Sequence, residues 1–341
     1  MLLILGCAIV LWFLSSCEES FSPSPQFEPR MVVYSILSTD KDTQFVRIYS
    51  TYNPSGNDPL TNPEEVPVTD AKVTVTSQDG TRYEFHRIDI ERPDKSRYPS
   101  NIKAYFAYPF RPEKGKTYTL TASSPTGGTA TAGITVPGRG AVEPYNDGVL
   151  ISPFDSRYIQ LDYGAAAKLS PEAKAFLVRI YVDYLSPVGG GYERKRFEVP
   201  ISRAVISCIN DKYKDTFPKP TLRTTPEYAG LGIKSEEKIT FRRRAYAGKL
   251  LLMRDIEGAG LRFVQAVLYL VQFDTQLWNY YSVANSYPER YSIRVDEPDY
   301  TNIKGGLGVF AGVAVDSTVF PLPERIFIPT EVNPCKYVSG E

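Results

Sequence analysis

Residues 306–311, Gly-Leu-Gly-Val-Phe-Ala, fit the GxGxxA pattern of dinucleotide-binding turns. That pattern binds a pyrophosphate where a strand leads into the glycines and a helix follows, because the helix N-terminus holds the phosphates. Here residues 313–320 are predicted to form a strand, so the helix is missing from the pattern. We therefore expect the glycines to serve a bulge or a close backbone approach, and we expect no cofactor.

Acid–base and nucleophilic catalysis find no support in the residue spacing. The single histidine, His86, lies in an alternating segment with no nucleophile signature such as GxSxG beside it. Adjacent acids occur at 236–237 and at 296–297, but neighbouring residues of a strand point to opposite faces. The loop acids do not have EF-hand spacing: Asp40, Asp42, Asp58 and Glu64. The sequence thus predicts no catalytic residue and no metal site.

Two short basic runs, 194–196 and 242–244, lie on predicted strands, where at most two of three residues share a face. The favoured interpretation is that these runs form cross-strand ion pairs with nearby acids, namely Glu193, Glu198, Glu236 and Glu237. The alternative is a basic patch that binds an anionic ligand or a lipid headgroup. Lys and Arg together number 39, as do Asp and Glu, so the formal net charge is zero. This balance argues against nucleic-acid binding, which needs a basic surface.

The N-terminus carries the features of a lipoprotein signal. Residues 2–14 form an apolar run that is shorter than the about 20 residues of a membrane-spanning helix but has the length of a signal-peptide core. Leu14-Ser15-Ser16-Cys17 resembles the bacterial lipobox, in which the cysteine is acylated and the chain is cleaved before it. Residues 1–16 are therefore predicted to be the signal peptide, although the basic residues that usually precede the apolar run are missing.

The residues after the predicted anchor point to the cell surface. Glu18 and Glu19 resemble the export signal that carries Bacteroidetes lipoproteins to the outer leaflet, and residues 17–28 are polar and proline-bearing, as in a tether. In such an oxidising compartment Cys208 and Cys335 can form a disulfide. Sequence distance does not decide whether they pair.

Short strands separated by turns fill the next region. The sequence predicts an immunoglobulin-like or transthyretin-like β-sandwich over residues 29–138, with about seven strands. The Asp79-Gly80 pair is typical of a hairpin turn. The clearest strands are 31–37, 44–49, 71–76, 83–85, 117–121 and 129–136.

A second β-rich domain, with one or two short helices, is predicted over residues 148–338, after a linker at 139–150. Strand 176–184 has one apolar face and one that carries Arg179 and Asp183, so we expect the latter face to meet water or a partner. Strand 261–273 is apolar on both faces and is expected to be central. Asp274 can cap a helix at 275–285, whose apolar stripe is interpreted as core packing, with a ligand platform as the alternative.

Several segments in order along the chain resemble one family, the Bacteroidetes outer-membrane lipoproteins catalogued as domain of unknown function 4249. The matching segments are 31–37, 67–75, 114–120 and 302–310, of which the last is the most distinctive. Its family markers, with a structural role and no catalytic one, are Asn302, Gly305, Gly306, Gly308 and Phe310. The resemblance implies an outer-membrane location and association with TonB-dependent transporters; it implies no activity.

These observations favour a non-enzymatic lipoprotein, anchored to the outer membrane at the cell surface, that assists a TonB-dependent transporter and binds a glycan or peptide nutrient. Loops at the ends of the sandwich would provide the binding residues. Two alternatives stay open. A structural or adhesive envelope module would have no concave polar pocket, whereas a glycan or peptide hydrolase would have two close carboxylates or an acid with a perturbed pKa.

Overall fold

The computed structural model describes residues 27–52, 64–96, 98–145, 163–199, 205–209, 212–216, 223–224, 236–241, 253, 260–285 and 300–322. These residues are mainly β, with a short helix, α3, at Thr275–Asn285. The mainly β fold class with a short helix is therefore confirmed. Within the described ranges no helix has the length and apolar character that a membrane span requires.

The N-terminal half is a two-layered β structure around one core. Its strands are β1 (Met31–Ser38), β2 (Gln44–Ser50), β3 (Lys72–Ser77), β4 (Arg82–Ile90), β5 (Ile102–Ala107), β6 (Thr117–Ser124) and β7 (Gly128–Thr135). Strand β4 joins the layers, because Arg82–Phe85 pair with β3 whereas His86–Ile90 pair with β5. One layer therefore consists of β1, β2, β5 and the second part of β4. The other layer consists of the first part of β4 with β3, β6 and β7.

The core between these layers comes from alternate residues of each strand. In β1 the inward residues Met31, Val33 and Leu37 are buried, and in β2 Val46 and Ile48 are. This is the period-2 pattern of a strand with one buried face. The outward positions of β1 and β2 are consequently fixed as well, and they form the surface considered below.

The C-terminal half continues the same sheet and adds smaller ones. Its strands are β8 (Ala141–Tyr145), β9 (Tyr163–Lys168), β10 (Ala175–Val188), β11 (Gly191–Val199), β12 (Val205–Ile209), β13 (Lys212–Thr216), β14 (Arg223–Thr224), β15 (Glu236–Phe241), β16 (Arg262–Phe273) and β17 (Leu307–Pro321). Strand β16 lies between β10 and β17, so the strand expected to be central is central. Val142 of β8 and Ala167 of β9 pack in one cluster with β10 and β16. Part of the expected 139–150 linker is therefore a strand, β8, because Val142 is buried in that cluster.

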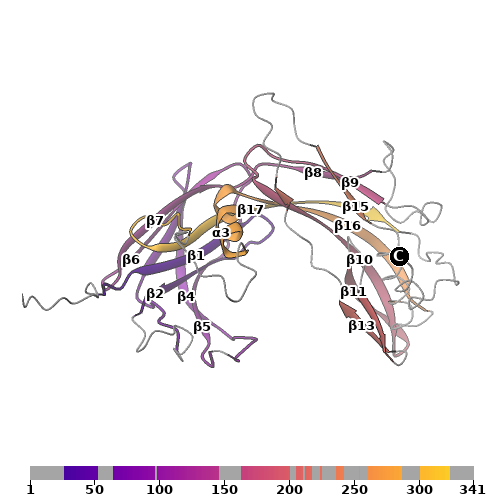
Figure 1. Cartoon of the computed structure of the whole chain (residues 1–341), viewed down its shortest axis with the longest axis horizontal. Coiled ribbons are helices and arrows are strands. Elements are labelled where there is room, and N and C mark those ends of the chain that lie inside the picture. Colours follow the sequence, from indigo (N-terminus) through magenta and orange to yellow (C-terminus); the bar gives the residue numbers. More distant parts are fainter. Residues whose placement is uncertain are drawn as a thin grey trace, which may run out of the picture.

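Strand β17 belongs to both halves of the molecule. Its residues 307–313 pair in parallel with β1, and 313–321 pair antiparallel with β16. Figure 1 shows β17 and β16 running across the molecule from one half to the other. Phe310 is buried in the N-terminal core, whereas Phe320 packs against the C-terminal core. The strand thus crosses the division that the sequence places between residues 138 and 148.

Helix α3 covers the outer face of β17. It begins after Asp274, whose Oδ1 accepts a hydrogen bond of 2.8 Å from the Leu277 backbone N–H, so Asp274 is the N-cap that the sequence predicts. Leu277 packs in a cluster with Val309, Ala311 and Val313. Core packing therefore explains Leu277, but another member of the predicted apolar stripe, Tyr281, is exposed.

Candidate functional site

Several of the expected site residues lie outside the described part of the chain. Cys17, Glu18 and Glu19 do, and so does Cys335. Cys208 is placed in β12, opposite Tyr213 of β13, without a described side chain. The anchor, the export signal and the disulfide consequently stay predictions, and the basic run at 242–244 is outside the described residues as well.

The motif at 302–310 forms the junction between β17 and the N-terminal sandwich. The side-chain amide of Asn302 bonds the backbone of Phe310 in both directions, with Nδ2 donating to the carbonyl at 2.7 Å and Oδ1 accepting from the N–H at 2.9 Å. Lys304 and Thr131 exchange backbone hydrogen bonds, which bring β7 against the same segment. Asn302 and Phe310 therefore fix the start of β17.

The glycines of this motif allow backbones to touch. Gly308 has φ +105°, and a Cβ there would lie 2.1 Å from the Val33 carbonyl oxygen; a Cβ at Gly306 would lie 2.6 Å from that of Met31. Gly305 has φ +77°, and its Cβ would lie 2.3 Å from the Thr129 carbonyl oxygen. Strand β17, not a helix, follows Gly306. The glycines thus serve the close backbone approach that the sequence predicts.

The basic run in β11 forms cross-strand ion pairs, but its partner is Asp183 of β10, which is not one of the four acids expected. Asp183 of β10 accepts hydrogen bonds from Arg196 at 2.5 Å and from Arg194 at 2.8 Å, while Glu198 pairs with Arg179. The hydrogen bond from Arg196 is the main cause that lowers the pKa of Asp183 to about 2. The face with Arg179 and Asp183 was expected to meet water or a partner; Asp183 itself is buried, whereas Arg194 and Arg196, which pair with it, are exposed to solvent.

His86 is an exposed residue of β4, and its ring meets Phe106 edge-on. Within the described ranges, no three His, Cys, Asp or Glu side chains gather as a metal ion would require.

The outward face of β1 and β2 carries large apolar and aromatic side chains. Tyr34 is 37% exposed, Ile36 46% and Phe45 42%. In the antiparallel register Tyr34 lies opposite Arg47 and Val32 opposite Tyr49. A contiguous exposed patch of such residues on a sheet that already has a full core beneath it is typical of a binding surface.

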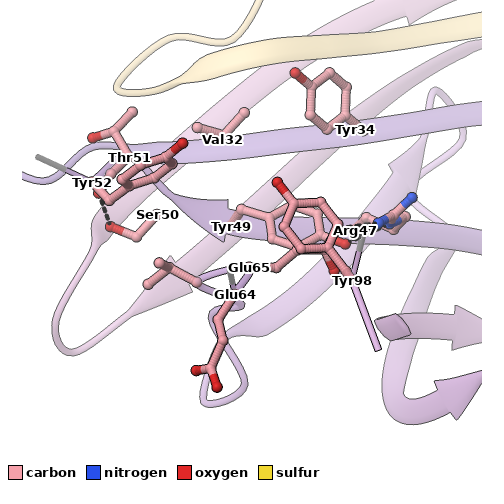
Figure 2. A pocket seen from close by; sticks show the side chains of 11 residues that line it. Val32, Tyr34, Arg47, Tyr49, Ser50, Thr51, Tyr52, Glu64, Glu65 and Tyr98 are labelled. Carbon is pink, nitrogen blue, oxygen red and sulfur yellow. Dashed lines mark hydrogen bonds and ion pairs between the residues drawn. The ribbon is translucent and has the colours of Figure 1, made fainter. Parts of the chain in front are cut away.

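Two hollows lie along this face and meet at Tyr34 and Arg47, and together we call them the outer-face groove. The tyrosine hollow has a volume of about 490 Å³. Figure 2 shows Tyr52 at one end of it and Arg47 at the other. The helix-side hollow has a volume of about 600 Å³ and extends under α3. Besides the two shared residues, the tyrosine hollow is lined by Val32, Tyr49, Ser50, Thr51, Tyr52, Glu64, Glu65, Val66 and Tyr98.

A polar network holds the side chains of the tyrosine hollow in place. Arg47 Nε donates to the Tyr49 hydroxyl at 2.7 Å, and the Glu65 carboxylate bonds both Arg47 and Arg92. The guanidinium of Arg47 lies 5.0 Å from the centroid of the Tyr49 ring, and that of Arg92 lies 5.4 Å from the Tyr98 ring. Burial raises the pKa of Tyr49 above its usual value, although the bond from Arg47 opposes this. Tyr49 therefore keeps its hydroxyl proton at neutral pH.

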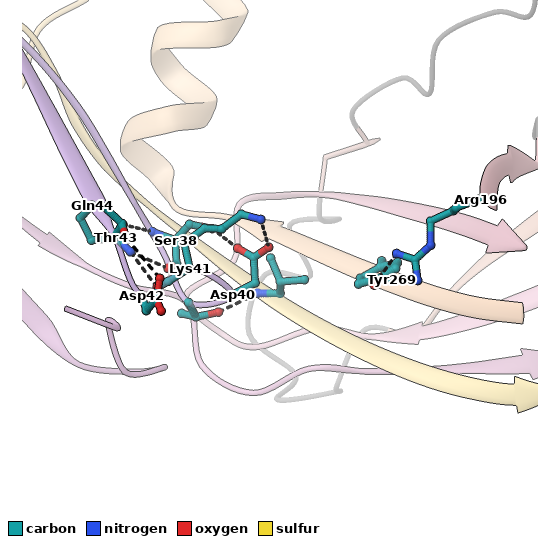
Figure 3. A network of polar contacts seen from close by, with 10 residues as sticks. Ser38, Asp40, Lys41, Asp42, Thr43, Gln44, Arg196 and Tyr269 are labelled. Carbon is teal, nitrogen blue, oxygen red and sulfur yellow. Dashed lines mark hydrogen bonds and ion pairs between the residues drawn. The ribbon is translucent and has the colours of Figure 1, made fainter. Parts of the chain in front are cut away.

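Buried Gln44 fixes the loop that borders the helix-side hollow. Its Nε2 donates to the carbonyl oxygens of Ser38, Lys41 and Phe110, and its Oε1 accepts from the Ser38 N–H at 2.9 Å. Figure 3 shows Gln44 beside Ser38 and the other residues of this loop. Gln44 thus helps to hold the loop between β1 and β2, together with hydrogen bonds of Thr39 with β17 and of Asp42 with Phe110.

Helix α3 forms the opposite border of the helix-side hollow. Tyr280 meets Tyr34 edge-on, with ring centroids 6.1 Å apart. Asp274 holds the start of the helix to β17, because its Oδ2 accepts from the Gly312 N–H at 2.8 Å. Burial raises the pKa of Asp274 to about 7.

Comparison with models of protein families matches residues 18–318 to the family described as Domain of unknown function (DUF4249). The chain belongs to this family. The match covers most of the chain, from the predicted tether into β17, and confirms the family expected from the segments at 31–37 and 302–310. Comparison with curated proteins gave no match. For this DUF4249 chain the lipoprotein character remains a prediction.

The sequence reasoning missed the outer-face groove and placed binding in the loops at the sandwich ends. A signal was present: Phe45, Arg47 and Tyr49 alternate with the buried residues of β2, so a hairpin with one buried face leaves large side chains in solvent. It was hidden in β1, where Val32 and Ile36 make the outward face as apolar as the inward one. Glu65 and Tyr98 come from distant segments, and no local pattern joins them.

Proposed function

We propose that this DUF4249 chain is a lipoprotein anchored to the outer membrane through Cys17, exposed at the cell surface, and a non-enzymatic accessory of a TonB-dependent transporter. It binds a nutrient, a glycan or a peptide, in the outer-face groove. The observation that carries this proposal is the groove itself, whose two hollows fall in the size range of ligand sites.

The anchor and the rigid frame support the same function. A lipobox-like cysteine followed by a short polar tether would hold the folded part close to a membrane protein partner. Strands β1 and β2 and the capped helix α3 form part of the groove, and the ion pairs of Glu65 with Arg47 and Arg92 hold side chains of the tyrosine hollow in place, which lowers the cost of ordering them on binding. A capture surface beside a transporter requires such a preformed site.

Affinity purification from native outer membranes tests the partner. A tagged chain should bring down one TonB-dependent transporter in a stoichiometric amount after mild detergent extraction. The matched control is Cys17→Ala, which should lose membrane attachment and the transporter together. Recovery of the wild-type chain from outer membranes with no transporter would refute the accessory function, and attachment of Cys17→Ala to membranes would refute the anchor.

The two other functions have less support. An adhesive or structural module could also use exposed aromatic residues such as Tyr34 and Phe45, and it predicts self-association or binding to envelope polymers in place of a transporter. A hydrolase would draw on an acid with a raised pKa. Asp274 has one, but it is buried and its two oxygens accept from the backbone of Leu277 and Gly312, so its surroundings explain it as a structural group.

A further inference from the structure

We propose that the ligand of the outer-face groove is a neutral oligosaccharide that lies across Tyr34, with sugar rings against the tyrosines of the tyrosine hollow. This inference rests on the proposed binding function and assigns its ligand class and its site. Three properties of the described residues carry it: the aromatic lining, the balance of charge, and the absence of a usable strand edge along the groove in the described residues.

The aromatic lining suits sugar rings. Tyr34 is exposed between the two hollows, and Tyr49, Tyr52 and Tyr98 line the tyrosine hollow. A pyranose ring has C–H groups on its faces, and their partly positive hydrogens are attracted to the negative face of an aromatic ring. Tyrosine adds a hydroxyl at the rim, which can bond the sugar hydroxyls, and it loses little conformational entropy on binding.

Three charged side chains at the tyrosine hollow form ion pairs with one another. Glu65 bonds Arg47 and Arg92 at once, and Arg47 also bonds the Tyr49 hydroxyl. With Arg92 included, the positive charges of Arg47 and Arg92 equal in number the negative charges of Glu64 and Glu65. An anionic ligand would have to draw Arg47 or Arg92 away from Glu65, whereas neutral hydroxyls can bond the outer edges of these groups, because guanidinium groups only donate and carboxylates only accept.

Among the residues that the structure describes, the backbone along the groove leaves no edge to which a peptide could add as a strand. Strand β1 is paired on both sides, with β17 and with β2. The other edge of β2 pairs with β5 at residues 44–46, and beyond them Ser50 N–H donates to Val66 and Val68 N–H donates to Ile48. Strand addition is a main route by which sheets bind extended peptides. The geometry therefore favours a glycan over a peptide.

The test is titration of the purified chain from residue 18 onward with a panel of defined neutral oligosaccharides, α- and β-linked glucans, mannans, xylans and galactans. At least one should bind, and Tyr34→Ala and Tyr49→Ala should each weaken it by about tenfold or more. Tyr34→Phe should bind within about threefold of wild type, since the ring remains. The matched control is Tyr192→Ala, an exposed tyrosine of β11 in the other half of the molecule, which should bind as wild type does.

Thermal unfolding of each variant separates lost binding from lost folding. The inference is overturned if no oligosaccharide of the panel binds, if binding survives both alanine variants, or if uncharged peptides or polygalacturonate bind the groove more tightly than every neutral glycan. A transporter that co-purifies with a chain that binds no glycan would refute this inference and leave the accessory function standing. Glycan binding lost in Tyr34→Ala, with no transporter recovered, would support the site and refute the accessory function.

Discussion

Gly308 has a backbone conformation and a setting that exclude any side chain. Its φ of +105° is outside the range of L residues, and a Cβ would lie 2.1 Å from the Val33 carbonyl oxygen. We expect Gly308→Ala to lower the free energy of unfolding by about 3 kcal/mol or more. In Gly133→Ala, by contrast, the nearest atom to the new Cβ is 4.0 Å away, so urea unfolding should show a change within about 0.5 kcal/mol. Equal stability of the two variants would contradict the close approach.

Asp274 should make stability depend on pH near neutrality. Its folded-state pKa of about 7 exceeds the ordinary 3.8, so the folded state binds the proton more tightly. The stability that this proton contributes is fully present below about pH 4 and is lost as the pH rises through 7. Asp274→Asn keeps a cap for Leu277 and does not titrate, so it should lack this decrease, which amounts to a few kcal/mol at about 1.4 kcal/mol per pKa unit.

The measurement is the free energy of unfolding of both proteins in urea at several pH values between 4 and 8. Replacement of an exposed acid, Asp42→Asn, is the control and should keep the wild-type pH dependence. The same dependence in Asp274→Asn as in wild type would show that Asp274 does not cause it.

For single residues, the sequence predicts the structural role of a side chain more readily than the residue with which that side chain interacts. The cap at Asp274 and the close approach of Gly308 were predicted, because both depend on neighbours in sequence or on backbone limits. The burial of Asp183 was not, because it depends on which residue of β11 faces it. The information was in the turn: Gly189 and Gly190 both have positive φ, and a two-residue loop there sets Asp183 opposite Arg196.

Helix α3 is held by its cap and by the packing of Leu277 and Tyr280 on one face. Leu277 packs on Val309, Ala311 and Val313, whereas Tyr281 on the same helix is exposed. We expect Leu277→Ala to lower stability by about 2–4 kcal/mol and to speed hydrogen exchange in α3 more than in β3 or β6. Tyr281→Ala should leave exchange in α3 unchanged. Uniformly faster exchange across all strands would show that α3 does not open on its own.

Element positions were largely predictable, because period-2 patterns and turn residues are local. Helix 275–285 and strands such as 31–37 and 261–273 agree with the structure within a residue or two. Strands β5, β8, β9, β12, β13 and β14 were not predicted. Each is short, and β8 contains Pro144, a residue that usually argues against a strand. Pairing between distant elements, such as β1 with β17, leaves no local pattern and could not be predicted.

The largest consequence of β17 is that it joins the two halves of the molecule into one sheet. Residues 302–313 complete the N-terminal sandwich, and residues 313–321 complete the C-terminal sheet. A division read along the sequence would give the halves separate stabilities. A shared strand whose first part is buried in the N-terminal core, and whose Phe320 packs against the C-terminal core, instead predicts that they unfold together, because opening one half exposes part of the other's core.

Phe310→Ala tests this coupling at the whole-molecule scale. Phe310 is fully buried in the N-terminal core, so its loss should lower stability by about 3–5 kcal/mol. In a chain without residues 1–16, Trp278 of α3 is the only tryptophan, and circular dichroism follows the strands of both halves. If the halves are coupled, tryptophan fluorescence and circular dichroism should report one transition. Phe310→Ala should lower the midpoint denaturant concentration of that transition by the same amount in both signals. A circular-dichroism transition that splits in two, with one step unmoved by Phe310→Ala, would mean that the C-terminal sheet is stable without the sandwich that β17 completes.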